Sequence, residues 1–235
     1  KSDMAKATAE FYAKNGWDLS LAGRNINVEL SSFSHRLKDE YGCEINHYEL
    51  DILDFQSHSE FYKSFQKKPD GIICFIGILG NQKKSEIEFS EAKTVIDSNF
   101  TGIVSLINIF ANYYEEIGSG FIAGVSSVAG DRGRKSNYTY GSAKAGLTAY
   151  LSGLRNRLSS KNVHIMTVKP GYIATKMTKN MDLPDLLTVN PDYVAKKIFK
   201  MQQRRVDLTY VPGYWYFIMA FLKLIPERWF KKINI

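Results

Sequence analysis

The stretch Tyr138-Thr-Tyr-Gly-Ser-Ala-Lys144 decides how the rest of the chain is interpreted. It places Tyr140 and Lys144 four residues apart in a predicted helix, so both side chains lie on one face, a turn apart. Ser127 lies thirteen residues before Tyr140, at the end of an apolar run that predicts a strand. Together they suit proton transfer, because the ammonium favours the phenolate and is expected to lower the pKa of the tyrosine. The hydroxyl can hydrogen-bond a substrate carbonyl.

Strands and helices are predicted to alternate along the whole chain. Strands are expected at 18–24, 44–50, 71–76, 121–125, 163–168 and 207–211, with helices between them and a helix at 191–203. Strands that alternate with helices of this length predict right-handed crossovers and a doubly wound parallel sheet, an α/β fold. We expect one such domain over residues 1–211, followed by an apolar and basic helical tail over 212–235.

The carboxyl ends of these predicted strands carry residues suited to a ligand. In doubly wound sheets the ligand lies beyond the carboxyl ends of the strands. Because five strand ends agree, the sequence predicts a ligand cleft at this edge of the sheet. The residues concerned are Arg24, Asp51, Gly77, Ser127 and the pair Pro170-Gly171.

The motifs resemble those of the short-chain dehydrogenase/reductase family, up to about Val211. The family's serine and Tyr-x-x-x-Lys match Ser127, Tyr140 and Lys144, and its helical asparagine matches Asn99. The resemblance implies a Rossmann fold and a hydride transfer between NAD(P) and a carbonyl or secondary alcohol. It also implies the four roles: Tyr140 donates the proton, Lys144 holds the cofactor ribose, Ser127 orients the carbonyl, and Asn99 fixes a water.

A cofactor site is implied in the same way. Asp51-Ile52 is similar to the family's adenine-contacting pair, and Pro170-Gly171-Tyr-Ile-Ala-Thr175 to its nicotinamide segment. Only the glycine of the family's Asn-Asn-Ala-Gly is kept, in Cys74-Phe-Ile-Gly77. The cofactor-binding residues implied are Ser2, Asp3, Met4, Arg24, Asn25, Asp51, Ile52, Gly77, Tyr140, Lys144, Pro170, Gly171, Ile173 and Thr175.

The beginning of the chain departs from the family pattern. The family opens with a strand and a glycine-rich loop that brings backbone to the pyrophosphate at a helix N-terminus. Here Ser2-Asp3-Met4-Ala5 stands in that loop, and Asp3 is poorly suited to a pyrophosphate unless it caps the helix. We expect a strand and a Gly-x-x segment to precede Lys1 in the natural protein, because the sheet would otherwise lack its central strand.

Arg24 bears on the choice of cofactor. An acidic residue at this strand end would bind the ribose hydroxyls of NAD. The segment Ala22-Gly-Arg24-Asn25 has none, and Arg24 can pair with a 2′-phosphate. We therefore expect NADP, with NAD as the alternative if Arg24 only stacks on adenine or faces water.

Composition excludes several classes of function. A net charge of +7 permits an anionic ligand or membrane surface, but no arginine-rich block predicts nucleic-acid binding. The four histidines have no metal-ligand spacing, so no metal site is expected. Two separated cysteines, Cys43 and Cys74, fit a reducing compartment, so we expect a cytoplasmic protein, with the inner face of the membrane as an alternative position.

The tail over 214–232 combines apolar and basic residues and is too short to span a bilayer. It can anchor the protein at a membrane interface, or pack over the cleft or against another subunit. An anchor suggests a hydrophobic substrate. Here the chain is also similar to the branch of the family that works with a flavin oxidase to epimerise decaprenylphosphoryl ribose.

Several alternatives stay open at this point. The substrate could be a lipid-linked sugar or other hydrophobic molecule, or a 3-oxoacyl chain. The chain could also be a catalytically silent nucleotide-binding or scaffolding protein, as the altered glycine loop allows. A homo-oligomer is expected, with the predicted helices at 85–117 and 138–158 as its contact face.

Overall fold

Four parallel strands form the main sheet of the computed structural model, which describes residues 2–179 and 184–233. Their order is β3 (Gly71–Cys74), β4 (Gly120–Val125), β5 (Val163–Pro170) and β8 (Leu208–Val211). A second parallel pair is made by β1 (Leu19–Gly23) and β2 (Ile45–Glu49), and a third by the short strands β6 (Tyr172–Ile173) and β7 (Thr188–Val189). The predicted parallel α/β fold is confirmed.

The strands are split where the sequence suggests a missing central strand. Within the described residues, no hydrogen-bonded ladder joins β1 or β2 to β3. Aromatic contacts bridge part of the break, since the ring of Trp17 lies edge-on to that of Phe121, with their centroids 6.2 Å apart. The expectation that a further strand precedes Lys1 stays a prediction.

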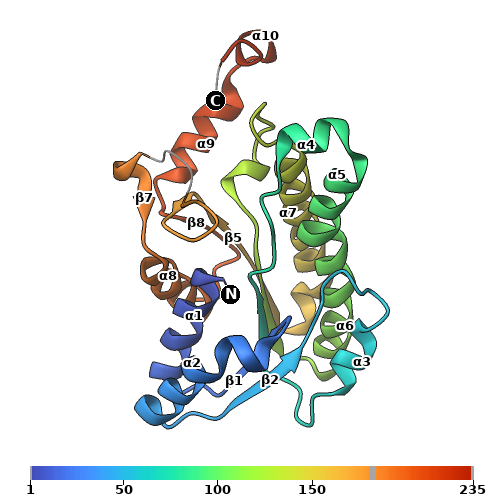
Figure 1. Ribbon diagram of the computed structural model, residues 1–235, viewed down its shortest axis with the longest axis vertical. Coiled ribbons are helices and arrows are strands. Elements are labelled where there is room, and N and C mark those ends of the chain that lie inside the picture. Colours follow the sequence, from blue (N-terminus) through green and yellow to red (C-terminus); the bar gives the residue numbers. More distant parts are fainter. Residues whose placement is uncertain (1, 180–183, 234–235) are drawn as a thin grey trace.

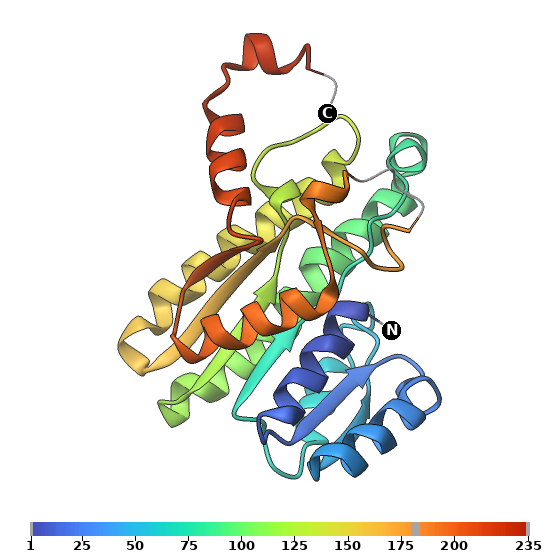
Figure 2. The same ribbon diagram turned by 90° about the vertical axis from the view of Figure 1, so that its left-hand side faces the viewer.

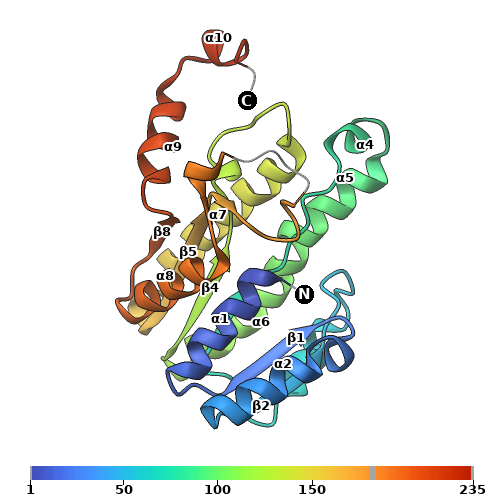
Figure 3. The same cartoon turned by 60° about the vertical axis from the view of Figure 1, so that its left-hand side comes forward.

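Helices cover both faces of the main sheet (Figures 1 and 3). On one face lie α6 (Gly102–Ile117) and α7 (Tyr138–Leu158); on the other lie α1 (Asp3–Lys14) and α8 (Pro191–Gln203). Neighbouring strand residues point to opposite faces, so Ile122 and Ile165 join the core under α6 and α7, while Ala123 and Met166 join the core under α8. Burial on both sides explains why these strands are apolar throughout.

The remaining helices frame the edges of the molecule. Helix α2 (Ile26–Tyr41) packs on β1 and β2, and α3 (His58–Lys63) packs on α6. Before α6 come α4 (Gln82–Ile87), α5 (Phe89–Ile96) and a π-turn, η1 (Asp97–Thr101). The run Phe89–Ile117 is long and apolar enough to cross a membrane, but half of its apolar window is buried in the fold. Ile103, Ile107 and Phe110 belong to the core, so we describe this run as a core helix.

The tail forms helices, as predicted. Helices α9 (Trp215–Leu224) and α10 (Glu227–Phe230) rise beyond the body from the end where β8 finishes (Figure 2). Only one side of α9 is packed: Trp215 and Met219 are buried in a small cluster with Val128 and Tyr210. The tail is therefore seated on the turn that follows β4 and on the end of β8 itself.

Candidate active site

The site is built at the carboxyl end of β4 and the first turns of α7. Ser127 follows β4 and begins a 3₁₀ turn, η2 (Val128–Gly130), in which its hydroxyl accepts a hydrogen bond from the N–H of Ala129 at 3.1 Å. The same hydroxyl interacts with the phenol of Tyr140 in a way that favours the phenolate. A β-carbon added to Gly130 would lie 2.7 Å from the backbone of α7, so turn and helix touch directly and fix the spacing between Ser127 and Tyr140.

Lys144 is buried beside this pair, with 3% of its surface exposed. Its Nζ donates to the carbonyls of Val125 at 3.1 Å and Ile76 at 3.4 Å, and lies 5.8 Å from the centroid of the Tyr140 ring. Burial disfavours the charged form and lowers the pKa of Lys144 to about 8. The neighbouring Ser126 donates its hydroxyl to the Lys144 carbonyl at 2.9 Å and so ties the strand to the helix.

The pKa of Tyr140 differs from the sequence expectation. Burial raises it to about 12, and the interaction with Ser127 opposes this only in part. The expectation that Lys144 lowers it was wrong in direction, because the ammonium directs its hydrogen bonds at the carbonyls of Val125 and Ile76 and not at the phenol. Tyr140 is therefore a neutral hydroxyl that can act as a proton donor.

Asn99 reaches the same point from the π-turn η1. Its Nδ2 donates to the carbonyls of Ile78 at 2.7 Å and Val95 at 2.8 Å, while its Oδ1 is buried without a hydrogen-bond partner. A β-carbon at Gly77 would lie 2.4 Å from that Oδ1 and 3.1 Å from Lys144 Nζ. Only glycine fits here, and the buried acceptor beside an ammonium is a place where a water can bind. The four predicted catalytic residues thus converge on one point.

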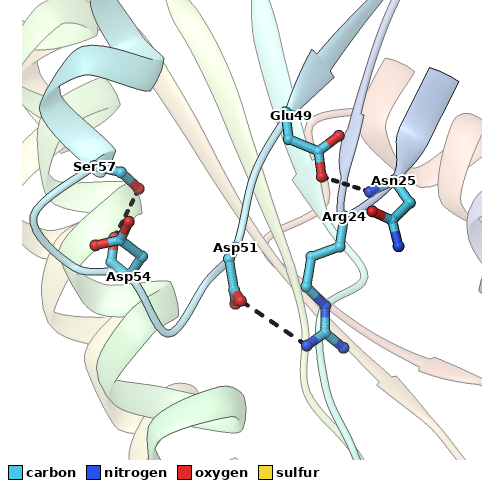
Figure 4. Close-up of a pocket in the computed structure, with 6 residues that line it drawn as sticks. All are labelled: Arg24, Asn25, Glu49, Asp51, Asp54 and Ser57. Atoms are coloured by element: carbon cyan, nitrogen blue, oxygen red, sulfur yellow. Dashed lines mark hydrogen bonds and ion pairs between the residues drawn. The ribbon is translucent and has the colours of Figure 1, made fainter.

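The predicted adenine end of the cofactor site is an open pocket of about 620 Å³ (Figure 4). The guanidinium of Arg24 lies 3.9 Å from the carboxylate of Asp51, and both side chains remain half-exposed. Ile52, in contrast, is buried in the core, where its carbonyl faces Gly102. The charged side chains of Arg24 and Asp51 are therefore available to a ligand, whereas the side chain of Ile52 contributes to the hydrophobic core.

Glu49 is a pocket residue that the sequence analysis missed. Its carboxylate accepts hydrogen bonds from the N–H groups of Asn25 at 2.5 Å and Ile26 at 3.2 Å, at the start of α2. Asn25 has a left-handed backbone, with φ of 51°, that turns these donors toward Glu49. Glu49 ends β2, so the strand-end rule could have found it. Asp54 and Ser57 also line the pocket and were missed.

The N-terminal residues lie beside the segment that follows β6. Ser2 caps α1, since its hydroxyl accepts from the N–H of Ala5 at 3.3 Å. Asp3 does not cap the helix; its carboxylate accepts from the N–H of Lys176 at 2.8 Å. Met4 packs on the core under α8. These residues therefore join the start of α1 to the predicted nicotinamide segment.

The predicted nicotinamide segment is held by β8 and the tail. The N–H of Gly171 donates to the carbonyl of Val211 at 2.9 Å, and a β-carbon at Gly171 would lie 1.9 Å from the indole nitrogen of Trp215. Pro170 ends the β5 ladder opposite Val211. Thr175 bonds to Thr178 through its N–H, at 3.1 Å, and Ile173 is buried. The contact with Trp215, from the tail, was not predicted.

A buried ionic cluster lies next to the loop that follows Ser127. Asp131 pairs with the ammonium of Lys169 and accepts a hydrogen bond from the hydroxyl of Tyr210 at 2.7 Å. Asp131 and Lys169 side chains are only 3% and 7% exposed, so neither charge has much access to water. The cluster ties the loop after Ser127 to the ends of β5 and β8.

A parallel α/β sheet with a tyrosine, a lysine, a serine and an asparagine at its carboxyl edge defines an oxidoreductase of the NAD(P)-dependent dehydrogenase class. A family model described as short chain dehydrogenase matches residues 2–185. The chain belongs to the short-chain dehydrogenase family.

Relatives of known sequence agree with this assignment. An uncharacterized oxidoreductase of Mycobacterium tuberculosis (strain CDC 1551 / Oshkosh), MT2133, is 33% identical over 71% of this chain and 68% of its own length. The 3-oxoacyl-[acyl-carrier-protein] reductase FabG of Chlamydia muridarum is 26% identical over 74% of this chain and 71% of its own length.

Solved structures agree on the fold. A short-chain dehydrogenase from Sphingobium yanoikuyae in complex with NADPH matches with a TM-score of 0.82 at 21% identity, covering 99% of this chain and 93% of the other. The bulky-bulky ketone specific alcohol dehydrogenase from Comamonas testosteroni matches with a TM-score of 0.81 at 19% identity, covering 99% and 91%.

The residues present fit a nicotinamide cofactor. Gly77 leaves room for the side chains of Asn99 and Lys144 to pack against its backbone, which places a buried acceptor and an ammonium together at this edge of the sheet. The half-exposed side chains of Arg24 and Asp51 offer charged groups in the predicted adenine pocket.

Proposed function

We propose that this protein transfers hydride reversibly between NADP(H) and a carbonyl or secondary alcohol on a hydrophobic substrate. The observation that supports the proposal is the convergence of Tyr140, Ser127 and Lys144: the serine hydroxyl interacts with the phenol, and the amine lies 5.8 Å from the centroid of its ring. A bound nicotinamide supplies or accepts the hydride.

The side chains carry the proton in this proposal. In reduction, Ser127 donates a hydrogen bond to the carbonyl oxygen, and Tyr140 gives its proton to the forming alkoxide. A phenol with a pKa of about 12 is protonated at neutral pH and is therefore ready to act as the acid. Lys144, with a pKa of about 8, is mainly charged at neutral pH and can return a proton to Tyr140 through a water held by Asn99 Oδ1.

The replacement Tyr140→Phe tests the reaction, because it removes the phenol oxygen and little else. We expect turnover to fall at least 100-fold, on the order of the contribution of general acid catalysis, while NADPH binding, followed by fluorescence, is retained. The matched control is Tyr138→Phe, since Tyr138 lies two residues away and is 44% exposed. Unchanged turnover in Tyr140→Phe would refute the assignment. Cofactor binding without turnover in any substrate screen would instead favour the catalytically silent protein.

We propose NADP(H) over NAD(H) on the basis of Arg24. Its guanidinium is 63% exposed and can bind a 2′-phosphate, whereas Glu49 already occupies the first N–H groups of α2. The variant Arg24→Ala should raise the KM for NADPH about 10- to 100-fold, as expected for loss of a charge-assisted contact of about 1.5–3 kcal/mol, and leave the KM for NADH unchanged. The control is Lys38→Ala, which removes an exposed cation from α2, the helix that follows Arg24. Equal effects on both cofactors would contradict the proposal.

The substrate is proposed to be hydrophobic, with a lipid-linked sugar as the preferred class. The support is the apolar tail, whose Trp215 lies against Gly171 next to the site. A 3-oxoacyl chain is the second candidate, favoured by the similarity to reductases named FabG. Following NADPH absorbance with lipid-linked ketoses and 3-oxoacyl thioesters separates the two. We also propose that the protein is a homo-oligomer whose subunits meet through the adjacent helices α6 and α7, and sedimentation would test this oligomeric state. Its proposed location is the cytoplasm.

A further inference from the structure

One side of the tail is apolar and largely solvent-exposed, although Tyr216 on this side also contacts the ring of Tyr210, with 5.6 Å between the centroids. In α9, at 100° per residue, the exposed apolar residues fall within an arc of about 140°. The buried Trp215 and Met219 lie on the opposite side. We call the exposed side, together with the large exposed ring of α10, the outward face. It consists of Tyr216, Phe217, Phe221, Leu224 and Trp229, which are 55%, 73%, 67%, 81% and 57% exposed.

The side chain of Arg132 holds the two helices of the outward face in place. The guanidinium of Arg132 donates to the carbonyls of Leu222 at 2.5 Å and Ile225 at 2.7 Å, which end α9. It also bonds to Glu227 at 2.8 Å and lies 3.7 Å from the centroid of the Phe230 ring. One largely buried arginine, with 13% of its side chain exposed, thus links the end of α9 to α10, and the two helices project from the body (Figure 2).

Within the part of the chain that the structure describes, the unpaired charges around the outward face are positive. The sole acidic residue of 214–232, Glu227, is paired with Arg132 and does not offset them. A symmetric contact with a second copy through this face would bring two sets of cations together. An anionic surface complements them instead. The cations are Lys223, Arg228, Lys231 and Lys232.

We propose that the outward face docks on an anionic lipid bilayer, lying in the interface without spanning it. An amphipathic helix with aromatic residues on one side and cations beside them is typical of interfacial binding. Helix α9 has ten residues, about half of what a bilayer crossing needs. Because α9 begins four residues after β8 ends, the docked surface lies at the same end of the molecule as the candidate active site (Figure 1).

Flotation of the full chain with vesicles tests the proposal and requires no turnover. We expect the protein to float with phosphatidylcholine vesicles that contain phosphatidylserine, less with phosphatidylcholine alone, and less as salt is raised. Each exposed phenylalanine contributes about tenfold to partitioning. The double variant Phe217→Glu, Phe221→Glu should therefore bind at least tenfold more weakly. The matched control is Ile87→Glu, Phe89→Glu, in which both residues are equally exposed, at 86% and 76%, but lie elsewhere.

Three results would overturn the docking proposal. The first is a wild-type chain that does not float with anionic vesicles, and the second is a double variant that floats as the wild type does. The third is a wild-type dimer in sedimentation that becomes a monomer in the double variant, without flotation of either, which would assign the outward face to a second copy. NADPH binding and thermal unfolding of each variant establish that it is folded, so a failure here is separate from a failure of the proposed reaction.

Discussion

Gly77→Ala tests whether the close packing of Gly77, Asn99 and Lys144 sets the geometry of the site. The added methyl would lie 2.4 Å from Asn99 Oδ1 and 3.1 Å from Lys144 Nζ. Ordinary carbon contacts are about 3.5 Å, so the asparagine amide must move by about 1 Å. Overpacking of this kind costs about 1–3 kcal/mol, which lowers Tm by about 2–12 °C in a domain of this size.

The effect on catalysis should exceed the effect on stability. A displacement of about 1 Å in a reacting site can cost about 100-fold in rate, so we expect kcat to fall 10- to 100-fold in an NADPH absorbance assay. Gly153→Ala is the control, because a β-carbon there meets nothing within 4 Å and α7 should gain about 0.5–1 kcal/mol. If Gly77→Ala kept both the Tm and the kcat of the wild type, Gly77 would not hold the site together.

Three further predictions concern the surroundings of the site. Lys144 has a pKa near 8 in the fold against an ordinary 10.5, so the unfolded chain binds more protons between these values. The free energy of unfolding should therefore rise from pH 8 to 10.5, and Lys144→Met should lack this rise in urea titrations; a parallel pH dependence in both proteins would contradict the shift. Asp131→Ala leaves the ammonium of Lys169 buried and unpaired, and should cost about 3–5 kcal/mol in urea unfolding; a loss below about 1 kcal/mol would mean that the pair contributes little to stability. Arg132→Ala should release the tail, seen as cleavage by trypsin after Lys223 about tenfold faster at an unchanged global Tm, and unaltered cleavage would show that other contacts hold it.

The regular fold could be predicted because its strands are short apolar runs bounded by polar residues. The ranges 121–125 and 191–203 agree closely with β4 and α8. The range 71–76 was two residues too long, since β3 pairs only as far as Cys74, opposite Gly124. The small pair β6–β7 was missed, because two-residue strands have no periodicity to detect.

Some features of the candidate site could likewise be predicted from the sequence, and others could not. Offsets along one helix placed Tyr140 and Lys144 correctly, because local geometry fixes them. The partner of Asp3 lies 173 residues away at Lys176, and no local pattern encodes such a contact. The π-turn around Asn99 is a single turn within the range 85–117, so the sequence indicated helix there without the change in hydrogen bonding. The direction of the Tyr140 pKa depended on burial, which a sequence does not give.

The loop after β4 holds the hydroxyl of Ser127 at one end and, five residues on, the arginine that clamps α9 and α10. The same short loop therefore positions both Ser127 and the arginine that contacts the tail. Chimaeras that exchange only residues 212–233 between relatives should consequently alter turnover numbers even though no reacting side chain changes. Exchanging the tail is therefore expected to offer a way to change substrate selectivity without replacing any of the proposed catalytic side chains.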